Sequence, residues 1–225
     1  MEKILNLIRE KIGLDVNSIG VYSLENTIKR RMEYYNFNHP DSYLIHLQKS
    51  PEELKELIEL IVVPETWFFR DKESFVFLNK YLTTEWLPKN SGQILRVLSM
   101  PCATGEEPFS IAITLLESGL NNQKFSIDAI DISYQSLHKA RTGIYEKNSF
   151  RGDDISYRDR YFLPNNNRYQ LYDYIKNAVS FSYGNILDDL FMLNKQPYDI
   201  IFCRNLLIYL HNNARQKALQ SLTKL

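Results

Sequence analysis

Cysteine is scarce in this sequence, and its scarcity excludes two classes of protein. The 225 residues contain only Cys102 and Cys203, too few for a disulfide framework and without the paired CxxC spacing of a metal site. The four histidines do not cluster as metal ligands either; they are His39, His46, His138 and His211. No internal repeat or low-complexity tract stands out. We expect no metal and treat both thiols as core or near-site groups.

The sequence also lacks an excess of charge and any long apolar run. Lysine plus arginine equals aspartate plus glutamate at 27 each, so no global field favours nucleic acid, although a local basic face is possible. Charges recur every few positions in residues 1–15, which excludes the apolar core of a signal peptide. No later stretch approaches membrane-spanning length. These absences predict a soluble, cytoplasmic protein with no nucleic-acid partner and no direct membrane insertion.

Residues 1–88 carry a helical pattern. With 44% apolar and 13% aromatic residues, the chain can bury one core, or one core plus a small satellite domain. Apolar residues recur at helical spacing from residue 4 to 12 and from 24 to 35. Ser50 caps a third helix, Pro51 fits its first turn, and Glu53 completes a capping box. Another helix is predicted over 72–81, and a loop at 88–92 ends a helical domain of residues 1–88.

After residue 92 short apolar runs alternate with helical stretches. The expected strands span 94–98, 125–130, 179–183 and 198–203, and helices at 107–118 and 134–142 separate the first two. This βαβ arrangement predicts an α/β domain, a mainly parallel doubly wound sheet over residues 89–225. The stretch 158–178 is less regular. Its asparagine-rich turn predicts a small hairpin, and so a possible small β-subdomain.

The turn after the first expected strand is the candidate ligand site. In doubly wound sheets ligands bind beyond the carboxyl ends of the strands, and Gly105 allows backbone to approach a ligand closely. The G-x-G-x-x-G pattern is absent, and Glu106 and Glu107 oppose a phosphate. Two carboxylates there suit a cationic or hydroxyl-bearing ligand. Equally, they could only favour the start of the following helix electrostatically.

Polar residues follow all four expected strands. Asp131 lies just after the second strand, where an acidic side chain can accept hydrogen bonds from ribose hydroxyls, although it could also be an ordinary helix cap. Asn185 follows the third strand and could bond an adenine edge. Arg204 and Asn205 follow the fourth. The pattern favours a nucleoside-containing, positively charged ligand, and S-adenosylmethionine has an ammonium, a sulfonium and ribose hydroxyls.

Four segments of the sequence resemble motifs of one known family. Residues 64–70 (PETWFFR) resemble N-E-T-x-F-F-R, residues 102–110 (CATGEEPFS) resemble C-S-T-G-E-E-P-Y-S, and residues 202–209 (FCRNLLIY) resemble F-C-R-N-x-x-I-Y. Residues 139–145 (KARTGIY) fit as well. Together these segments resemble the CheR-type chemoreceptor glutamate methyltransferases. The resemblance covers about residues 60 to 210, with the segments in order and sensibly spaced.

The resemblance implies a function and a set of site residues. The fold is then a Rossmann-like S-adenosylmethionine-dependent methyltransferase domain preceded by a small all-helical domain. The activity is methylation of chemoreceptor glutamates, which forms methyl esters in chemotaxis adaptation and leaves S-adenosylhomocysteine. Arg70 and Tyr209 stand nearest the methyl-transfer point, and Glu107 is preferred over Glu106 by its motif position. The implied cofactor-binding residues are Thr66, Arg70, Glu107, Asp131, Asn185, Ile186, Arg204 and Asn205.

The family docks its helical domain on the receptor's helical bundle through a basic helix. Lys29, Arg30 and Arg31 are the matching candidates here. The commoner meaning of such a charge run is a solvated helix face. Some members of the family also bind a tethering peptide at the receptor's C-terminus, and their small β-subdomain contains glycines. The 163–176 region here lacks these glycines, which favours binding without a tether.

Three features depart from the family pattern. Pro64 stands in place of the usual asparagine and removes a side-chain amide. Ser133 replaces an aspartate found two residues beyond the ribose-binding one. The chain stops at Leu225 within an expected helix while the family's sheet continues, so the resemblance predicts a C-terminally truncated domain with an unpaired sheet edge.

The implied reaction needs no general base. A glutamate with a reference pKa of about 4.3 is already ionised at neutral pH, so a site that excludes water and aligns the reactants supplies much of what is needed. Arg70 would orient the acceptor carboxylate, and Tyr209 would hydrogen-bond near it. Residues 67–69 would exclude water or pack the domain junction. Two alternatives stay open: a methyltransferase for another protein or a small carboxylic acid, and a noncatalytic sensor or scaffold that binds the cofactor.

Overall fold

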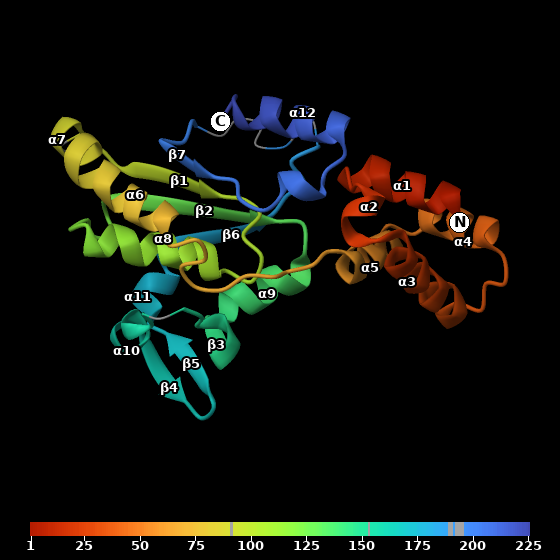
Figure 1. Ribbon diagram of the computed structural model, residues 1–225, viewed down its shortest axis with the longest axis horizontal. Coiled ribbons are helices and arrows are strands. Elements are labelled where there is room, and N and C mark those ends of the chain that lie inside the picture. The colour runs from red at the N-terminus through yellow and green to blue at the C-terminus, as the bar shows by residue number, and fades with distance from the viewer. Residues whose placement is uncertain (91, 153, 189–190, 192–195) are drawn as a thin grey trace. The chain divides into compact units, whose positions relative to one another are not determined.

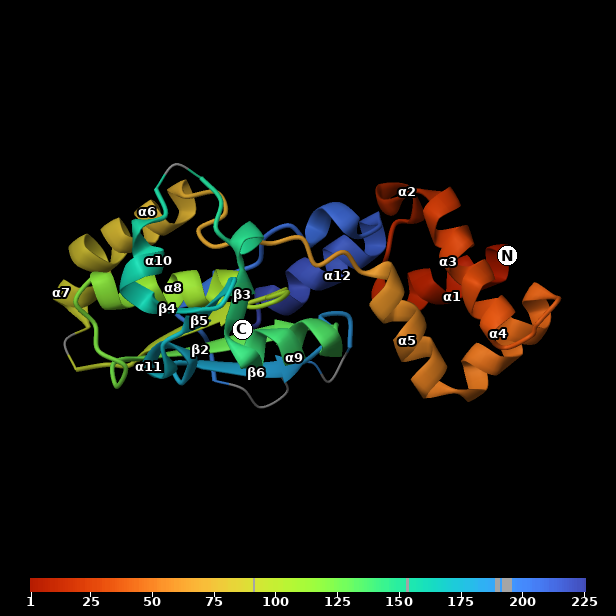
Figure 2. The same cartoon turned by 90° about the horizontal axis from the view of Figure 1, so that it is seen from below.

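The chain folds into two compact units, which Figures 1 and 2 draw from two sides. The computed structural model describes residues 1–90, 92–152, 154–188, 191 and 196–225. The first unit comprises Met1–Val63, Asn185–Lys195 and Arg204–Leu225. The second unit comprises Pro64–Gly184 and Gln196–Cys203.

Short amphipathic helices build the first unit. Each of α1 (Glu2–Ile12) and α3 (Val21–Tyr34) buries one face at the predicted helical spacing. The buried residues are Ile4, Ile8 and Ile12 in α1 and Leu24, Ile28 and Met32 in α3. Its other helices are α2 (Val16–Ile19), α4 (Pro40–Lys49), α5 (Pro51–Ile61), the 3₁₀ turn η3 (Leu207–Tyr209) and α12 (Asn212–Leu222).

Helix α5 begins as predicted, but its capping box is only half formed. The Ser50 hydroxyl accepts a hydrogen bond from the backbone N–H of Glu53 at 3.2 Å. In a full capping box the Glu53 side chain would also accept a bond from the Ser50 N–H. That part of the prediction is wrong, because the Ser50 N–H donates to the carbonyl of His46. Glu53 is buried instead, and it binds Arg31 and Tyr43.

This buried carboxylate ties three helices of the first unit together. The Arg31 Nε of α3 donates to Glu53 Oε1 at 2.9 Å, its Nη2 pairs with the other carboxylate oxygen, and the Tyr43 hydroxyl of α4 donates to Oε1. Burial alone would raise the pKa of the Glu53 carboxyl, but the bonds from Arg31 and Tyr43 outweigh burial and hold that pKa below its ordinary value.

The C-terminal segment of the chain completes the first unit. Leu210 forms an antiparallel bridge with Leu14, and the N–H of His211 donates to the carbonyl of Gly13 at 3.0 Å. A Cβ on Gly13 would lie 2.6 Å from the Cβ of Ala214, so only glycine fits this approach. The start of the chain and the turn before α12 are therefore held together.

A parallel sheet of four strands organises the second unit. Its strand order is β6-β2-β1-β7, and all three pairings are parallel. The strands are β1 (Leu95–Ser99), β2 (Phe125–Asp131), β6 (Val179–Tyr183) and β7 (Ile200–Phe202). Ser99 pairs with both Ala129 and Phe202, so the carboxyl ends of the three neighbouring strands β2, β1 and β7 meet at one edge.

Helices connect and cover these strands. Helix α8 (Glu106–Glu117) follows β1, and α9 (Tyr134–Thr142) follows β2. Helix α6 (Glu73–Tyr81) continues through the π-helical turn η1 (Leu82–Trp86) into α7 (Leu87–Lys89), and α6 packs with α8 on one face of the sheet (Figure 1). The predicted fold class is confirmed: helices come first, followed by a mainly parallel α/β domain.

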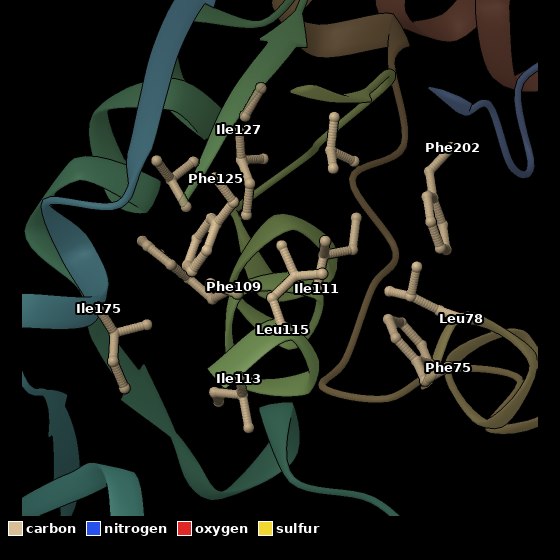
Figure 3. Packing of buried hydrophobic residues seen from close by; sticks show 14 of the residues in the cluster. Phe75, Leu78, Phe109, Ile111, Ile113, Leu115, Phe125, Ile127, Ile175 and Phe202 are labelled. Atoms are coloured by element: carbon tan, nitrogen blue, oxygen red, sulfur yellow. The ribbon is translucent and has the colours of Figure 1, made fainter. Parts of the chain in front are cut away.

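The division between the units falls at Val63 and Pro64 rather than near residue 88. Phe75, Leu78 and Trp86 are buried in one hydrophobic cluster with residues of β1 and β2, so α6 and η1 belong to the second unit. Figure 3 shows Phe75 and Leu78 beside Phe202 of β7. A helical pattern predicts a helix but does not say which core the helix joins.

A second, antiparallel sheet lies in the second unit, with strand order β3-β5-β4. Strands β4 (Phe162–Asn165) and β5 (Arg168–Leu171) lie within the expected 158–178 region and turn at Asn166, whose φ is 53°. Strand β3 (Ile144–Glu146) was not expected. The short elements η2 (Lys147–Ser149), α10 (Ser156–Tyr161) and α11 (Asp173–Lys176) complete this unit.

Candidate active site

The turn between β1 and α8 brings backbone close to the strand ends. Gly105 has a φ of 94°, in the left-handed region that favours glycine. A Cβ there would lie 2.9 Å from both the Ala140 Cβ and the Tyr145 hydroxyl. The Tyr145 hydroxyl in turn donates to the carbonyl of Thr104 at 2.8 Å. The close approach inferred for Gly105 therefore has a concrete cause.

The adjacent residues Glu106 and Glu107 have different environments. Glu106 is 1% exposed and accepts bonds from the hydroxyls of Thr104 and Ser149 at 2.6 and 2.9 Å. Burial raises the pKa of its carboxyl. Glu107 is half-buried, and its Oε1 accepts a bond from the Ser99 hydroxyl at 2.8 Å. Glu106 is thus an internal tie, while Glu107 is the carboxylate accessible to a ligand.

Asp131 lies at the end of β2 and is fixed by backbone donors. Its Oδ2 accepts from the N–H of Ala103 at 2.8 Å and its Oδ1 from the N–H of Ser133 at 2.9 Å. Its carbonyl accepts from Gly184 after β6. Each carboxylate oxygen can accept more than one hydrogen bond, so these bonds orient Asp131 and remain compatible with hydroxyl contacts.

The charges of Glu107 and Asp131 act on a shared region. Burial first, and then both carboxylates, raise the pKa of the Cys102 thiol. Burial, followed by Glu107, raises the pKa of Cys203 to about 11. Both cysteines are free. Glu107 therefore lies near both thiols and Asp131 near Cys102, so two carboxylates gather at the ends of β1, β2 and β7. This pair suits a cationic, hydroxyl-bearing ligand such as S-adenosylmethionine.

Ser133 has a clear role in place of the family's aspartate. Its hydroxyl accepts a bond from the N–H of Ser136 at 3.0 Å and so caps α9. Aspartate and serine cap helices about equally well. This departure therefore preserves the start of α9.

The Pro64–Arg70 segment is held by two bonds from its backbone. The Phe68 N–H donates to the carbonyl of Ser149, and the Phe69 N–H donates to the Ser110 hydroxyl, each at 2.9 Å. Phe68 is fully buried among aromatic rings that include Tyr145 and Phe150. Phe68 therefore packs in the hydrophobic core of the second unit, rather than at the domain junction as one of the two expected roles had it.

Arg70 and Trp67 are oriented by their own segment. The Arg70 Nη1 donates to the carbonyl of Glu65 at 2.8 Å, and its guanidinium carbon lies 4.6 Å from the centroid of the Trp67 ring. Thr66, Trp67 and Arg70 are all half-buried. Pro64 is exposed, and the structure gives no account of its replacing asparagine.

The other predicted site residues belong to the first unit. The Asn185 side-chain amide donates to the carbonyl of Lys11 at 2.8 Å, and its oxygen accepts from the N–H of Leu187. Ile186 is buried and Arg204 half-buried, whereas Asn205 is exposed with a φ of 57°. Tyr209 lies in η3, where its carbonyl accepts from the Asp15 N–H at 2.8 Å.

The three basic candidates on α3 differ in accessibility. Lys29 and Arg30 are exposed. The Arg31 side chain is only 16% exposed and is bound to Glu53. Arg31 therefore has a structural partner of its own, which the charge run did not reveal.

Several residues around the site were missed from sequence. Ser99, Ser110 and Ser149 hold Glu107, the 64–70 segment and Glu106, and Arg151 contacts Trp67. Ser110 lies inside the quoted motif, which was a usable signal. Ser149 and Arg151 reach the site through contacts with residues far away in the sequence, and no local pattern indicates such contacts.

The part of the chain that the structure describes contains no metal-binding cluster and no helix suited to cross a membrane. No group of three or more histidine, cysteine, aspartate or glutamate side chains there could hold a metal ion. None of its helices combines the length and the apolar character needed to cross a bilayer. A cavity of about 280 Å³ lies in the second unit between Phe109, Arg141, Lys176 and Phe181, and none of the predicted site residues lines it.

Comparison with known families identifies both parts of the chain. Residues 64–225 match the model of the CheR methyltransferase SAM-binding domain, and residues 1–62 match that of the CheR methyltransferase all-alpha domain. The chain belongs to the CheR methyltransferase family. The resemblance drawn from the four motifs is thereby confirmed, and the chain contains the family's S-adenosylmethionine-binding domain.

Curated relatives are similar over nearly the whole chain. A probable biofilm formation methyltransferase WspC of Pseudomonas aeruginosa is 43% identical over 97% of this chain and 52% of its own length. Its counterpart in Pseudomonas putida is 38% identical over 100% and 53%. The chain thus spans about half the length of these relatives. Chemotaxis protein methyltransferase 2 of Vibrio cholerae is 32% identical over 94% of this chain and 75% of its own length.

Proposed function

We propose that this CheR family chain methylates glutamate side chains of a chemoreceptor, with S-adenosylmethionine as the methyl donor. One observation carries the proposal: Glu107 and Asp131 lie at the carboxyl ends of the parallel strands, within the segment that matches the family's S-adenosylmethionine-binding domain. The names of the relatives, methyltransferases of biofilm formation and of chemotaxis, support it.

The residues of the second unit divide the work of binding the donor. Asp131 would accept hydrogen bonds from the ribose hydroxyls, and Glu107 would meet a positively charged or hydroxyl group. Thr66 and Arg70 would contact the donor from the 64–70 segment. Asn185, Ile186, Arg204 and Asn205 are the cofactor-binding candidates of the first unit, as the family motifs imply.

The acceptor carboxylate needs orientation rather than deprotonation, since it is already ionised at neutral pH. When bound, S-adenosylmethionine supplies a methyl group on a positively charged sulfur. Arg70 would orient the acceptor through charge-assisted hydrogen bonds, and Trp67 and Glu65 hold its guanidinium in place. Tyr209 would hydrogen-bond near the transfer point. The product is a glutamate methyl ester, which loses the negative charge of the acceptor.

The ion pair in α3 supports a choice among the receptor-docking candidates. Because Arg31 is bound to Glu53, we assign docking on the receptor's helical bundle to Lys29 and Arg30. Both side chains are exposed on the same helix. Their positive charge suits a receptor surface rich in glutamate.

Calorimetric measurement of S-adenosylhomocysteine binding by variants of Glu107 and Glu106 tests the proposed donor site. Glu107→Gln should weaken S-adenosylhomocysteine binding roughly 10- to 100-fold, because it removes a charged hydrogen-bond acceptor. Glu106→Gln is the matched control, and it should change the dissociation constant less than about threefold because Glu106 faces Thr104 and Ser149. Equal effects of the two substitutions would contradict the assigned site.

Radiolabelled methyl transfer to a receptor cytoplasmic fragment tests the reaction itself. Arg70→Ala should lower kcat about 100-fold, because it removes a preoriented charge next to the reacting atoms. It should weaken donor binding much less, because the other donor-binding residues remain. A wild-type chain that binds the donor but transfers no methyl group would favour the noncatalytic alternative. Methyl transfer only to a small carboxylic acid would favour the alternative of a methyltransferase with a small-molecule substrate.

A further inference from the structure

Two guanidinium groups share one aromatic ring in the second unit. The guanidinium carbon of Arg70 lies 4.6 Å from the centroid of the Trp67 ring, and that of Arg151 lies 4.7 Å from it. Such cation–π contacts hold a guanidinium in a fixed plane at small energetic gain when the site is exposed. The indole therefore sets the positions of both charges relative to each other.

Arg151 is held at its base and accessible at its tip. Its Nε donates to the carbonyl of Asn148 at 3.1 Å. Its Nη1 lies 3.6 Å from Glu65 Oε1, with side-chain exposures of 49% for Arg151 and 57% for Glu65. At that distance the pair is an ion contact and not a hydrogen bond.

The weakness of this ion pair makes Glu65 a replaceable partner. An exposed pair of this kind contributes little stability, since water and salt screen both charges. A carboxylate from another molecule could therefore take the place of Glu65 at small cost. The internal contact also demonstrates the chemistry that Arg151 accepts, namely a side-chain carboxylate approaching its Nη1 edge.

The shared ring limits how far apart the two guanidiniums can lie, and that limit allows two carboxylates on one helix to reach both. The guanidinium carbons of Arg70 and Arg151 lie 4.6 and 4.7 Å from the centroid of the Trp67 ring, so their separation cannot exceed the sum of these two distances. Residues three or four apart on a helix have Cβ atoms about 5–6 Å apart on the same face. Two glutamates at this spacing can therefore reach Arg70 and Arg151 together, since both pairs of side chains are long.

We propose that Arg151 binds a second carboxylate of the acceptor segment, three or four residues from the glutamate that Arg70 orients. This inference rests on the proposed function and deepens it. The substrate class becomes a helical segment with paired acidic residues, and a helix with one isolated glutamate is a poorer substrate. Arg151 acts as a specificity-determining residue and takes no part in the transfer.

Kinetics with two peptides test the proposal. The first is a helical acceptor peptide with a target glutamate and a second glutamate four residues away, and the second peptide carries glutamine at that second position. The wild-type chain should show a KM about fivefold lower for the diacidic peptide. Arg151→Gln should bring the two KM values together with kcat unchanged, and Arg151→Lys should keep part of the difference.

The chain offers a matched control and a substitution of opposite sign. Arg168 also has an exposed carboxylate partner, Glu146, at 3.7 Å, so Arg168→Gln should leave the ratio of KM values unchanged. Glu65→Gln removes the internal competitor and should lower the KM for the diacidic peptide. An Arg151→Gln variant that keeps the wild-type ratio, or loses it no more than Arg168→Gln does, would overturn the proposal.

A binding arm separates this inference from the proposed function. Calorimetry measures the dissociation constants of both peptides for the wild-type and Arg151→Gln chains in the presence of S-adenosylhomocysteine. Loss of the diacidic preference in Arg151→Gln supports the inference even if no methyl group is transferred, in which case only the proposed activity fails. If methyl transfer occurs but Arg151→Gln keeps the wild-type preference for the diacidic peptide, the proposed activity holds and the proposed role of Arg151 is refuted.

Discussion

The three glutamates that matter most in this chain differ through their surroundings. Glu53 is buried against Arg31 and Tyr43, Glu106 is buried against two hydroxyls, and Glu107 is half-buried at the strand ends. A buried charge is stable only where partners replace its lost hydration. One residue type therefore serves as a structural tie, an internal acceptor and a candidate ligand contact.

Replacing Glu53 should destabilise the first unit. Glu53→Gln leaves the Arg31 guanidinium partly buried without its counter-charge, which should cost roughly 3 kcal/mol of unfolding free energy. Urea unfolding at neutral pH measures the loss. Glu56→Gln, an exposed position on the same helix, is the control and should lie within about 0.5 kcal/mol of wild type.

The same comparison should depend on pH in a defined direction. Because the pKa of Glu53 is lowered on folding from its ordinary value of 4.5, its stabilisation is present above that value and is lost as the pH falls through the folded-state pKa. The free-energy gap between wild type and Glu53→Gln should therefore shrink on acidification. A gap that stays constant from about pH 6 to pH 3 would contradict this assignment.

At the scale of residues, the sequence predicted those that follow strands and missed those that reach the site from elsewhere. Asp131 and the Glu106–Glu107 pair were predicted because parallel strands end at one edge, and the family motif then favoured Glu107 over Glu106. Arg151 and Ser149 meet their partners across more than 40 intervening residues, and no local pattern encodes such contacts. Arg31 was predicted to bind the receptor together with Lys29 and Arg30, because the sequence does not reveal its partner Glu53.

At the scale of elements, long periodic segments were predicted well and short ones poorly. The helices at α1, α3, α5, α6, α8 and α9 and the four parallel strands match the patterns from which they were inferred. Helix α4 and strand β3 were not predicted. Strand β3 has only three residues, too few for a period to appear, and it is specified by pairing with β5.

The two ends of α8 allow backbone strain to be separated from close packing. Gly105 before the helix and Gly119 after it have φ values of 94° and 93°. A Cβ at Gly105 would lie 2.9 Å from Ala140 Cβ, whereas one at Gly119 meets nothing within 4 Å. Gly119→Ala should therefore cost only the strain of roughly 1–2 kcal/mol.

Gly105→Ala should cost more than Gly119→Ala because it adds crowding at a buried turn. We expect a further loss of about 1–3 kcal/mol of unfolding free energy, together with weaker S-adenosylhomocysteine binding. Thermal unfolding and calorimetry of both variants measure these effects. Equal destabilisation by the two substitutions would mean that the turn relaxes without cost.

At the scale of the whole molecule, a chain with no net charge carries its charges in local groups. The carboxylates of Glu107 and Asp131 lie at the sheet edge, and the exposed cations Lys29 and Arg30 lie on α3. Local charge of this kind acts on partner choice and association rate more than on the fold. Composition alone therefore could not reveal either group.

Reversing the charge of α3 should weaken receptor recognition alone. Lys29→Glu combined with Arg30→Glu should raise the KM for a receptor fragment about tenfold, most strongly at low salt. The affinity for S-adenosylhomocysteine should not change. Lys49→Glu with Lys55→Glu, on other helices of the same unit, is the control. An unchanged KM in the variant with both Lys29 and Arg30 replaced would mean that these residues only form a solvated helix face and do not bind the receptor.

The chain has two tryptophans, and the structure places them in contrasting surroundings. Trp86 is 4% exposed in the hydrophobic core, while Trp67 is half-buried and contacts the guanidiniums of Arg70 and Arg151. The indole emission of Trp86 should remain constant, and that of Trp67 should respond when an acidic segment displaces Glu65. The molecule thus carries its own optical reporter at the place where an acceptor would arrive, together with an internal reference.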